Sequence, residues 1–171
     1  MISEEGRRHL IRVCDVLNKY DVDYLIIGGA AVSHYGFSRP SGVGITGGNN
    51  IDLDFWYNPT NENYLKLLSA LDKLDVETTS LRELVFDSKK TYLKITLDEF
   101  HLDFLPTMQG LKSFRDSKAT SEKTNYDGAE VRFLSYDDLI LNKKAINRKT
   151  DQSDIEELDK IRKGKKHSRG I

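Results

Sequence analysis

The sequence predicts an α+β fold with an α/β-like order of elements, in which helices flank a small mixed β-sheet. Apolar residues recur at helical spacing over 3–19 and again over 61–74. Two short apolar runs with strand character lie at 24–27 and 51–56, and alternating residues over 91–105 favour a hairpin. Since helical and strand-like segments are mixed along the chain without a repeat, one sheet surrounded by helices accounts for their order.

Length and composition indicate one folded domain without a strong charge bias. The chain has 171 residues, of which 38% are hydrophobic and 31% charged, enough apolar material for a core. We expect a single domain over 1–163 and a basic, disordered tail over 164–171. The formal net charge of −1 gives no global attraction to nucleic acid or to a membrane.

Cysteine usage and hydropathy predict a soluble protein of the cytoplasm. The single cysteine, Cys14, has no partner for an internal disulfide and fits a reducing compartment. The N-terminal stretch MISEEGRRHL contains no apolar signal core, and no run in the sequence is long enough to span a bilayer.

Helix-starting residues, glycines and apolar spacing define the first half of the chain. Ser3 begins the first helix, Gly36 closes a short one, and Thr60 caps a third. The predicted elements are a helix over 3–19, a strand over 24–27, a helix over 30–36, a glycine-rich loop over 38–50, a strand over 51–56 and a helix over 61–74. The buried side of the last helix is predicted to carry Tyr64, Leu65, Leu67, Leu68 and Leu71.

The second half of the chain has weaker signals. The hairpin is predicted to turn at Asp98-Glu99, and Ser135 followed by Asp138 resembles a capping box that opens a helix. The predicted elements are a weak strand over 84–86, a hairpin over 91–105, an irregular polar segment over 107–128, a strand over 131–134, and helices over about 136–147 and 152–163.

Three aspartates occupy the polar faces of two predicted strands. In IDLDFW, alternation places Asp52 and Asp54 on the face opposite the apolar residues, and in FHLDFL it does the same for Asp103. If the two strands are neighbours, three carboxylates meet on one surface, which is costly unless cations neutralise them. Oxygen ligands suit Mg²⁺ or Mn²⁺, and two such ions can clamp a phosphoryl displacement. The alternative is an ordinary solvent-exposed sheet face, which we disfavour because a Gly-Gly turn accompanies the three acids.

The strand over 24–27 ends in Gly28-Gly29 and leads directly into a helix. Unpaired N–H groups at such a junction bind phosphate, and glycine lets the backbone approach the ligand closely. Taken alone, the pair is as well explained by a tight turn; followed by an Asp-x-Asp strand and a later strand Asp, it favours phosphate contact.

These motifs follow one another in a recognisable order. The segment GG-x-AV-x-x-YG is followed by Arg39, then DLDFW, HLDFLP and finally DDLILNKKAINRKTDQSDIEEL. The order resembles that of the DNA polymerase β-like nucleotidyltransferase superfamily over about 24–158. The similarity is closer to small bacterial nucleotidyltransferase-like proteins, including relatives of abortive-infection toxins and of minimal nucleotidyltransferases in toxin–antitoxin pairs.

The resemblance implies a role for each motif. Asp52 and Asp54 would hold the metals that bridge the nucleotide phosphates. Asp103 would hold the catalytic metal and help to deprotonate the acceptor hydroxyl. Gly28 and Gly29 would cradle the β- and γ-phosphates.

Three basic residues are further candidates for nucleotide or phosphate binding: Arg39, Lys143 and Arg148. The stretch that follows Arg39 is longer than in many relatives, and its glycine-rich part, 41–50, is either a flap over the triphosphate or a slack insertion. Lys143 and Arg148 either reach the triphosphate or a nucleic-acid acceptor, or are solvated helix positions.

For other polar and aromatic residues we favour structural roles over functional ones. His101 shares the face of Asp103, and the basic tail either attracts RNA or is a solvated terminus. The residues with a favoured structural role are Ser33, His34, Trp56, Tyr57, His101, Asp151 and Asp154.

The sequence therefore predicts an enzyme, a Mg²⁺- or Mn²⁺-dependent nucleotidyltransferase. It would move a nucleoside monophosphate from a triphosphate such as ATP to tRNA, a protein or a small molecule. The resemblance adds a toxin–antitoxin or phage-defence setting. The alternative is a catalytically idle binding or regulatory protein of antitoxin type on the same fold.

Overall fold

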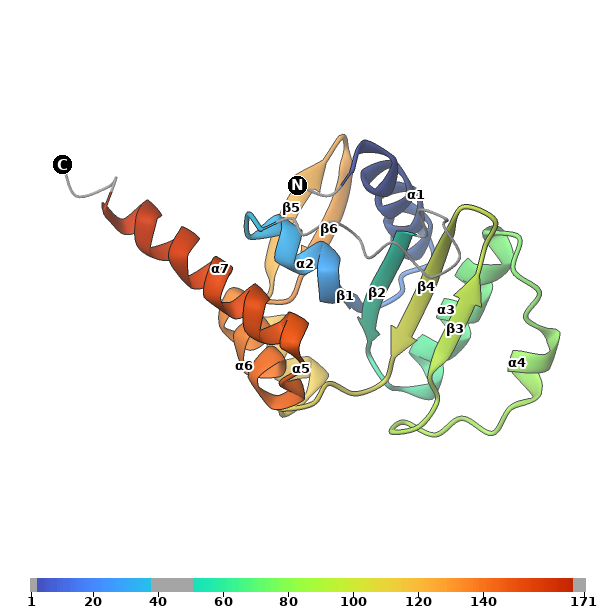
Figure 1. Ribbon diagram of the computed structural model, residues 1–171. Helices are drawn as coiled ribbons and strands as arrows, with labels where there is room; N and C mark the ends of the chain where they lie inside the picture. The colour runs from blue at the N-terminus through green and yellow to red at the C-terminus, as the bar shows by residue number, and fades with distance from the viewer. Residues whose placement is uncertain (1–2, 38–50, 168–171) are drawn as a thin grey trace.

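A six-stranded mixed sheet forms the centre of the protein, with the strand order β3-β4-β2-β1-β6-β5 (Figure 1). The computed structural model describes residues 3–37 and 51–167, with side chains described as far as residue 164. The strands are β1 (Tyr24–Ile26), β2 (Ile51–Tyr57), β3 (Leu93–Thr96), β4 (Phe100–Leu105), β5 (Glu122–Tyr126) and β6 (Ala129–Phe133). The β2–β4 and β1–β6 pairs are parallel, and the other three pairs are antiparallel.

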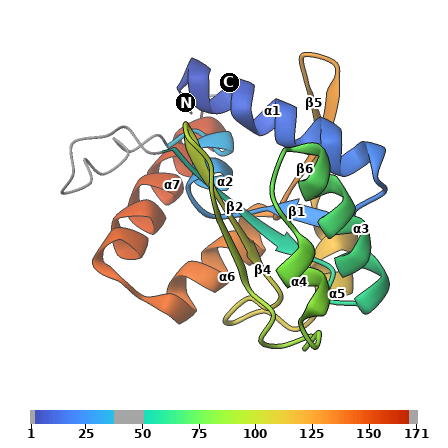
Figure 2. The same cartoon turned by 90° about the vertical axis from the view of Figure 1, so that its right-hand side faces the viewer.

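Helices cover both faces of this sheet. They are α1 (Glu4–Lys19), α2 (Gly28–His34), α3 (Asn61–Lys73), α4 (Thr79–Glu83), α5 (Phe114–Thr120), α6 (Tyr136–Ile146) and α7 (Lys149–His167). Figure 2 shows α3 on one side of the sheet and α2, α6 and α7 on the other. Among the described residues, none of the helices combines the length and apolar character needed to cross a membrane. The predicted fold class, a mixed sheet with flanking helices, is confirmed.

The register between β2 and β4 separates an apolar face from an acidic one. Leu53 pairs with Leu102 and Phe55 with Phe104, and all four side chains are buried. The rings of Phe55 and Phe104 stack with their centroids 5.1 Å apart. Because side chains alternate along a strand, the aspartates point to the opposite side of the sheet.

Helix starts follow the capping residues of the sequence. The hydroxyls of Ser3, Thr60 and Ser135 accept hydrogen bonds from the backbone N–H groups three residues further on, at 3.1, 3.2 and 3.2 Å. Each hydroxyl satisfies a donor that has no partner within its helix. The predicted starts of α1, α3 and α6 are confirmed.

Two predictions about exposed apolar residues were wrong. Leu65 was placed on the buried side of α3, but its side chain is 45% exposed. The segment 84–86 forms no strand, and Val85 is 94% exposed there. The local pattern resembled a strand, but no neighbouring strand pairs with this segment.

The segment 107–128 is not irregular, because it contains α5 and β5. Ser113 caps α5 by accepting from the N–H of Asp116 at 3.2 Å. Strand β5 pairs with β6 through a tight turn in which Asp127 and Gly128 have φ of 51° and 94°. Asp-Gly is a preferred pair for such a turn, so this hairpin had a sequence signal that was overlooked.

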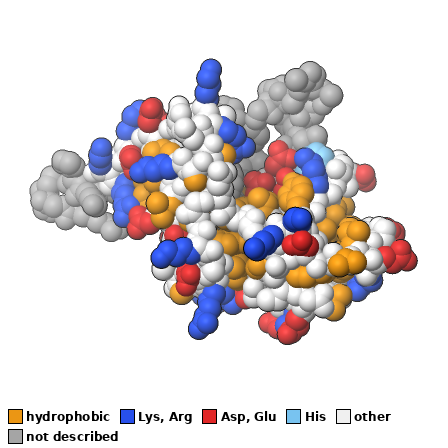
Figure 3. Space-filling view, turned by 90° about the horizontal axis from the view of Figure 1, so that it is seen from below, with side chains coloured by type: hydrophobic (Ala, Val, Ile, Leu, Met, Phe, Trp, Pro, Cys, Tyr) orange, Lys and Arg blue, Asp and Glu red, His pale blue; other side chains and the backbone are white. Residues whose placement is uncertain are grey.

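The last helix is longer than predicted, whereas α6 has close to its predicted bounds. Helix α7 begins at Lys149 instead of 152 and runs to His167, into the segment 164–171 that was predicted to be a disordered tail. Asn147 separates α7 from α6 with a left-handed conformation, φ 56° and ψ 35°. On the face shown in Figure 3, basic and acidic side chains are interspersed, in keeping with the formal net charge of −1.

Candidate active site

The register of the central strands brings the predicted acids together on one face. Asp54 of β2 lies directly opposite Asp103 of β4, and Asp52 lies opposite His101. Asp54 and Asp103 are half-buried, whereas Asp52 is exposed. We call the surface that carries the three aspartates the acidic face.

The junction of β1 and α2 packs against Asp54. Gly28 has φ +60°, and a β-carbon at this position would lie 2.1 Å from Oδ2 of Asp54. The N–H of Gly29 hydrogen-bonds the Asp54 carboxylate, and the N–H of Ile27 donates to the Asp54 carbonyl oxygen at 3.0 Å. The two glycines therefore stand beside the acids, and the Gly29 N–H predicted to hold phosphate is engaged by Asp54.

The electrostatics of the acidic face favour a cation. Burial, followed by the negative charges of Asp103 and Asp52, raises the pKa of Asp54 to about 6. The Gly29 hydrogen bond and the positive charge of Arg148 act in the opposite direction but do not offset the burial. A divalent cation beside Asp54 would stabilise its ionised form.

Asp103 has a polar atom that lacks a partner. Among the described residues, nothing hydrogen-bonds to the buried Oδ1 of Asp103 or to Nδ1 of His101. Leaving such atoms unpaired is costly, so a ligand or an ion is the simplest partner for them.

The donor set of the acidic face fits Mg²⁺ or Mn²⁺. Within 3–37 and 51–167, no three acidic, histidine or cysteine side chains already converge into a ready-made metal site. Asp54 and Asp103 nevertheless offer adjacent carboxylates, and Asp52 offers a third from an exposed position on the same face. Hard divalent cations take such oxygen ligands and retain bound waters to complete their coordination.

Tyr92 is a neighbour of the acids that sequence reasoning missed. It comes just before β3, and its hydroxyl interacts with the Asp103 carboxylate. Burial, together with this interaction and the three negative charges, raises the pKa of Tyr92 to about 12. Extending the alternation from Lys94, which pairs with Asp103, places Tyr92 on the acidic face, so the signal was present in the hairpin.

The predicted basic residues occupy two different environments. Lys143 is 3% exposed, and its Nζ lies 3.1 Å from Asp151 Oδ1 and 2.7 Å from Asp154 Oδ2. The Arg148 side chain is 64% exposed, pairs with Asp151 at 2.7 Å, and is close enough to Asp54 for its charge to act there. Arg39 and the glycine-rich loop over 41–50 lie outside the described residues.

Three other candidates have structural contacts. His34 stacks on Phe133 with ring centroids 4.0 Å apart. The Trp56 ring is buried, with Nε1 donating to the Pro106 carbonyl at 3.1 Å, and the Tyr57 hydroxyl donates to a backbone carbonyl at 2.5 Å. These contacts agree with the structural roles favoured for them from the sequence.

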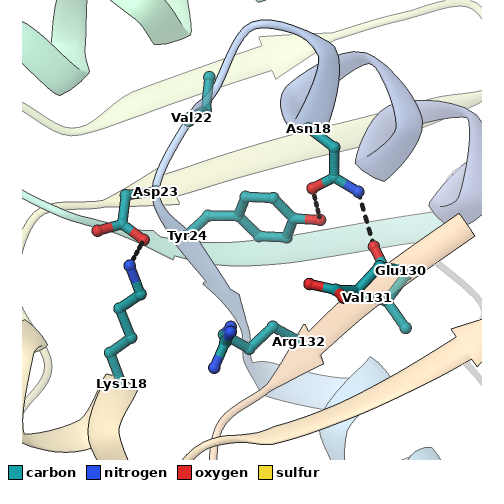
Figure 4. A pocket seen from close by; sticks show the side chains of 8 residues that line it. All are labelled: Asn18, Val22, Asp23, Tyr24, Lys118, Glu130, Val131 and Arg132. Atoms are coloured by element: carbon teal, nitrogen blue, oxygen red, sulfur yellow. Dashed lines mark hydrogen bonds and ion pairs between the residues drawn. The ribbon is translucent and has the colours of Figure 1, made fainter.

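A polar pocket of about 140 Å³ lies at the start of β1, at the opposite end of the strand from Gly28 (Figure 4). Lys118 pairs with Asp23 at 2.5 Å, and the Tyr24 hydroxyl donates to Asn18 Oδ1 at 3.0 Å. These lining groups pair with one another, and the pocket lies at the other end of β1 from the acidic face. The pocket therefore contributes no group to the acidic face.

The chain resembles known proteins in both sequence and fold. The family described as "Nucleotidyl transferase of unknown function (DUF2204)" matches residues 6–169. None of the proteins with curated descriptions matches the sequence.

Two crystal structures have a similar fold. A lincomycin-bound lincosamide antibiotic adenylyltransferase, LnuA, has a TM-score of 0.59 and 16% identity, over 94% of this chain and 98% of its own. A putative nucleotidyltransferase (TM1012) from Thermotoga maritima has a TM-score of 0.55 and 13% identity, over 98% and 96%. At these identities, the two structures establish the fold.

Proposed function

The chain belongs to this family of nucleotidyltransferases and is an enzyme, and we propose that it transfers a nucleoside monophosphate from a triphosphate to an acceptor hydroxyl. The observation that carries the proposal is the pair of facing carboxylates, Asp54 and Asp103, with Gly28 against one of them. A site built from half-buried like charges, a carboxylate oxygen without a partner among the described residues and a close glycine backbone suits a cation and a phosphate chain.

The reaction would be a displacement at the α-phosphorus. The acceptor oxygen forms a bond to phosphorus, the bond from phosphorus to the bridging oxygen breaks, and pyrophosphate leaves with the electron pair. Asp103 would take the hydroxyl proton, a role supported by its Oδ1, which has no hydrogen-bond partner among the described residues. Catalysis then consists mainly of positioning and of charge neutralisation.

Asp52, Asp54 and Asp103 would hold Mg²⁺ or Mn²⁺. When bound, the metal supplies positive charge that neutralises the triphosphate and the acids together. Because Gly28 has no β-carbon, there is room for the Asp54 carboxylate beside it, and Arg148 brings a positive charge to the same carboxylate.

The acceptor is to be sought among small molecules, proteins and tRNA. The similar LnuA structure is that of an adenylyltransferase with a bound small molecule, lincomycin, which makes small hydroxyl compounds the first class to test. A toxin–antitoxin or phage-defence role would correspond to a protein or tRNA acceptor.

Titration calorimetry with ATP, GTP, CTP and UTP tests the nucleotide half of the proposal. At least one triphosphate should bind in the presence of Mg²⁺ and lose affinity in EDTA. Asp54→Ala and Asp103→Ala should each weaken binding by about 100-fold or more, since each removes a metal ligand. Asp15→Ala is the matched control, because this aspartate lies on the surface of α1 and, within 3–37 and 51–167, its ion pair is with Lys19 at 2.7 Å. Failure of all four triphosphates to bind would overturn the proposal.

A transfer assay tests the chemistry and finds the acceptor. The preferred triphosphate, labelled at the α-phosphate, is incubated with cell extract, and label should enter an acceptor only with the wild-type protein. Label at the γ-phosphate should appear in pyrophosphate and not in the acceptor. Equal transfer by Asp103→Ala and wild type would show that the three-acid site is not the catalytic one.

A further inference from the structure

Four charged residues join α6 and α7 beside the acidic face. Lys143 of α6 is buried between Asp151 and Asp154 of α7, and both carboxylates are 0% exposed. Arg148 follows the left-handed Asn147 in the connection and supplies the fourth charge. The group contains equal numbers of positive and negative charges, which we call the α6–α7 charge cluster.

Within the cluster, Asp151 holds Arg148 through three hydrogen bonds. Its carboxylate accepts from the backbone N–H of Arg148 at 3.2 Å, from Nε at 2.7 Å and from Nη2 at 3.2 Å. The two hydrogen bonds from Nε and Nη2 fix the plane of the guanidinium and leave most of its N–H donors available. The side chain as a whole remains 64% exposed.

The held guanidinium stands beside the acidic face. Helix α7, which Arg148 immediately precedes, lies on the same side of the sheet as α2, and Gly28 at the start of α2 packs against Asp54 (Figure 2). The charges of Arg148 and Asp54 act on each other on this side of the sheet. Asp151 contacts both Lys143 and Arg148, and Asp154 contacts Lys143. Asp151 is therefore the member that connects the buried pair to the exposed arginine.

Burying Lys143, Asp151 and Asp154 costs desolvation free energy, which is a poor trade if these residues only hold α6 against α7. Apolar side chains of similar volume would join α6 to α7 at least as well, because desolvation offsets much of the attraction in a buried ion pair. The cluster also fixes an exposed guanidinium. An arginine held in one orientation loses less side-chain entropy when it binds phosphate.

We propose that Asp151 is a positioning residue, which orients the Arg148 guanidinium beside Asp54 so that its remaining N–H groups bind the triphosphate chain. Lys143 acts one step further away, because its Nζ contacts Asp151 from the buried side at 3.1 Å. The inference rests on the proposed function, since it assigns the cluster to the binding of the same triphosphate.

Four variants test it by calorimetry, with the Mg²⁺ complex of whichever of ATP, GTP, CTP and UTP binds the wild type most tightly. Asp151→Asn and Arg148→Ala should each weaken binding by about tenfold, the effect of losing one charge-assisted contact to phosphate. Asp154→Asn is the matched control: it also removes a carboxylate from Lys143 but keeps the three hydrogen bonds between Asp151 and Arg148, and should change affinity less than about twofold. The double variant Asp151→Asn/Arg148→Ala should bind no more weakly than Arg148→Ala alone.

Thermal unfolding separates positioning from a purely structural role. Asp151→Asn and Asp154→Asn should lower the melting temperature to a similar extent while differing in affinity. If Asp151→Asn does not fold, Arg148→Lys tests the same interaction by changing its exposed partner. Lysine keeps the positive charge but cannot make both guanidinium hydrogen bonds to Asp151. This variant should weaken binding several-fold.

Three results would overturn the inference while leaving the proposed function intact: wild-type affinity in Asp151→Asn or in Arg148→Lys, equal losses in Asp151→Asn and Asp154→Asn, or effects that multiply in the double variant. A wild-type protein that binds none of the four triphosphates would overturn both, and the first titration reveals this case.

Discussion

At Gly28 the backbone passes so close to Asp54 that there is no room for a β-carbon. The φ of +60° is also one that residues with side chains adopt at a cost. Two separate constraints, conformation and space, thus meet at one residue of the acidic face.

Gly28→Ala should destabilise the fold by about 2–4 kcal/mol and remove triphosphate binding, since strain and overpacking add at this position. Two glycines serve as controls in chemical unfolding and calorimetry. Gly128→Ala has a positive φ without a clash, so it should show the conformational cost alone, and Gly29→Ala has neither and should be close to neutral. If Gly28→Ala and Gly128→Ala were equally stable and both variants bound triphosphate, the close approach to Asp54 would have no importance.

At the scale of elements, a helix cap positions α3, which lies on the side of the sheet opposite the acidic face. Thr60 caps α3 by accepting from the N–H of Asn63 at 3.2 Å, and the Asn63 side chain in turn bonds the Asp23 backbone ahead of β1. The cap therefore links the start of α3 to the start of β1.

Thr60→Ala should lower the free energy of unfolding by about 1 kcal/mol and leave triphosphate affinity unchanged. The reason is that Asp54 packs against Gly28 of α2, and α2 lies on the other side of the sheet from α3. Ser69→Ala, which removes a hydroxyl from the interior of the same helix, is the control and should be neutral or slightly stabilising. Urea unfolding and calorimetry measure the two quantities. A loss of affinity in Thr60→Ala would mean that α3 influences the site through the sheet.

The same scale shows where sequence reasoning succeeds and where it fails. Helices with a capping residue and an apolar stripe were predicted to within a few residues, as at Ser3, Thr60 and Ser135. Strand β5 was missed because it is an edge strand with a mostly polar sequence, and its pairing with β6 depends on the turn at Asp127. Helix α5 was missed because it belongs to the same polar segment, which was predicted to be irregular. Leu65 was misplaced because its predicted burial assumed a wider apolar stripe than α3 presents.

For the molecule as a whole, the acidic face is a source of instability in the absence of metal. The pKa of Asp54 in the fold is about 6, above its ordinary value of 3.8. Between these two pH values the folded protein holds the proton more tightly than the unfolded chain, so stability falls as pH rises from about 4 to 6.

Asp54→Asn should therefore be more stable than wild type at pH 7 in EDTA, by about 1–3 kcal/mol, and the difference should vanish below about pH 4. Asn keeps an oxygen that can accept from the Gly29 N–H but carries no charge to repel Asp103. Urea unfolding of both proteins from pH 3.5 to 8 measures the difference, and a gap of the same size at every pH would contradict it. Asp15→Asn, on the surface of α1, should show no such rise.

Much of the candidate site followed from the sequence, because strand alternation alone determines which face Asp52, Asp54 and Asp103 occupy. What alternation does not supply is the parallel register that places Asp54 opposite Asp103, since register depends on the whole sheet. The contact of Gly28 with Asp54 joins segments far apart in sequence, so no local pattern predicts it. Tyr92 had a signal in the alternation of the hairpin, but its approach to Asp103 also depends on the pairing of β3 with β4. Arg148 and Asp151 are only three residues apart, yet their hydrogen bonds depend on side-chain direction.

The burial of Trp56 has a practical consequence. It is the only tryptophan in the chain, it lies two residues beyond Asp54 on β2, and its indole N–H is tied to the carbonyl of Pro106 just after β4. Its ring meets Phe114 edge-on, with centroids 5.4 Å apart. The tryptophan fluorescence of the protein therefore comes from one indole that bridges the two strands carrying the acids. A change in emission on adding Mg²⁺ or a triphosphate would be an optical signal of occupancy that needs neither a label nor knowledge of the acceptor.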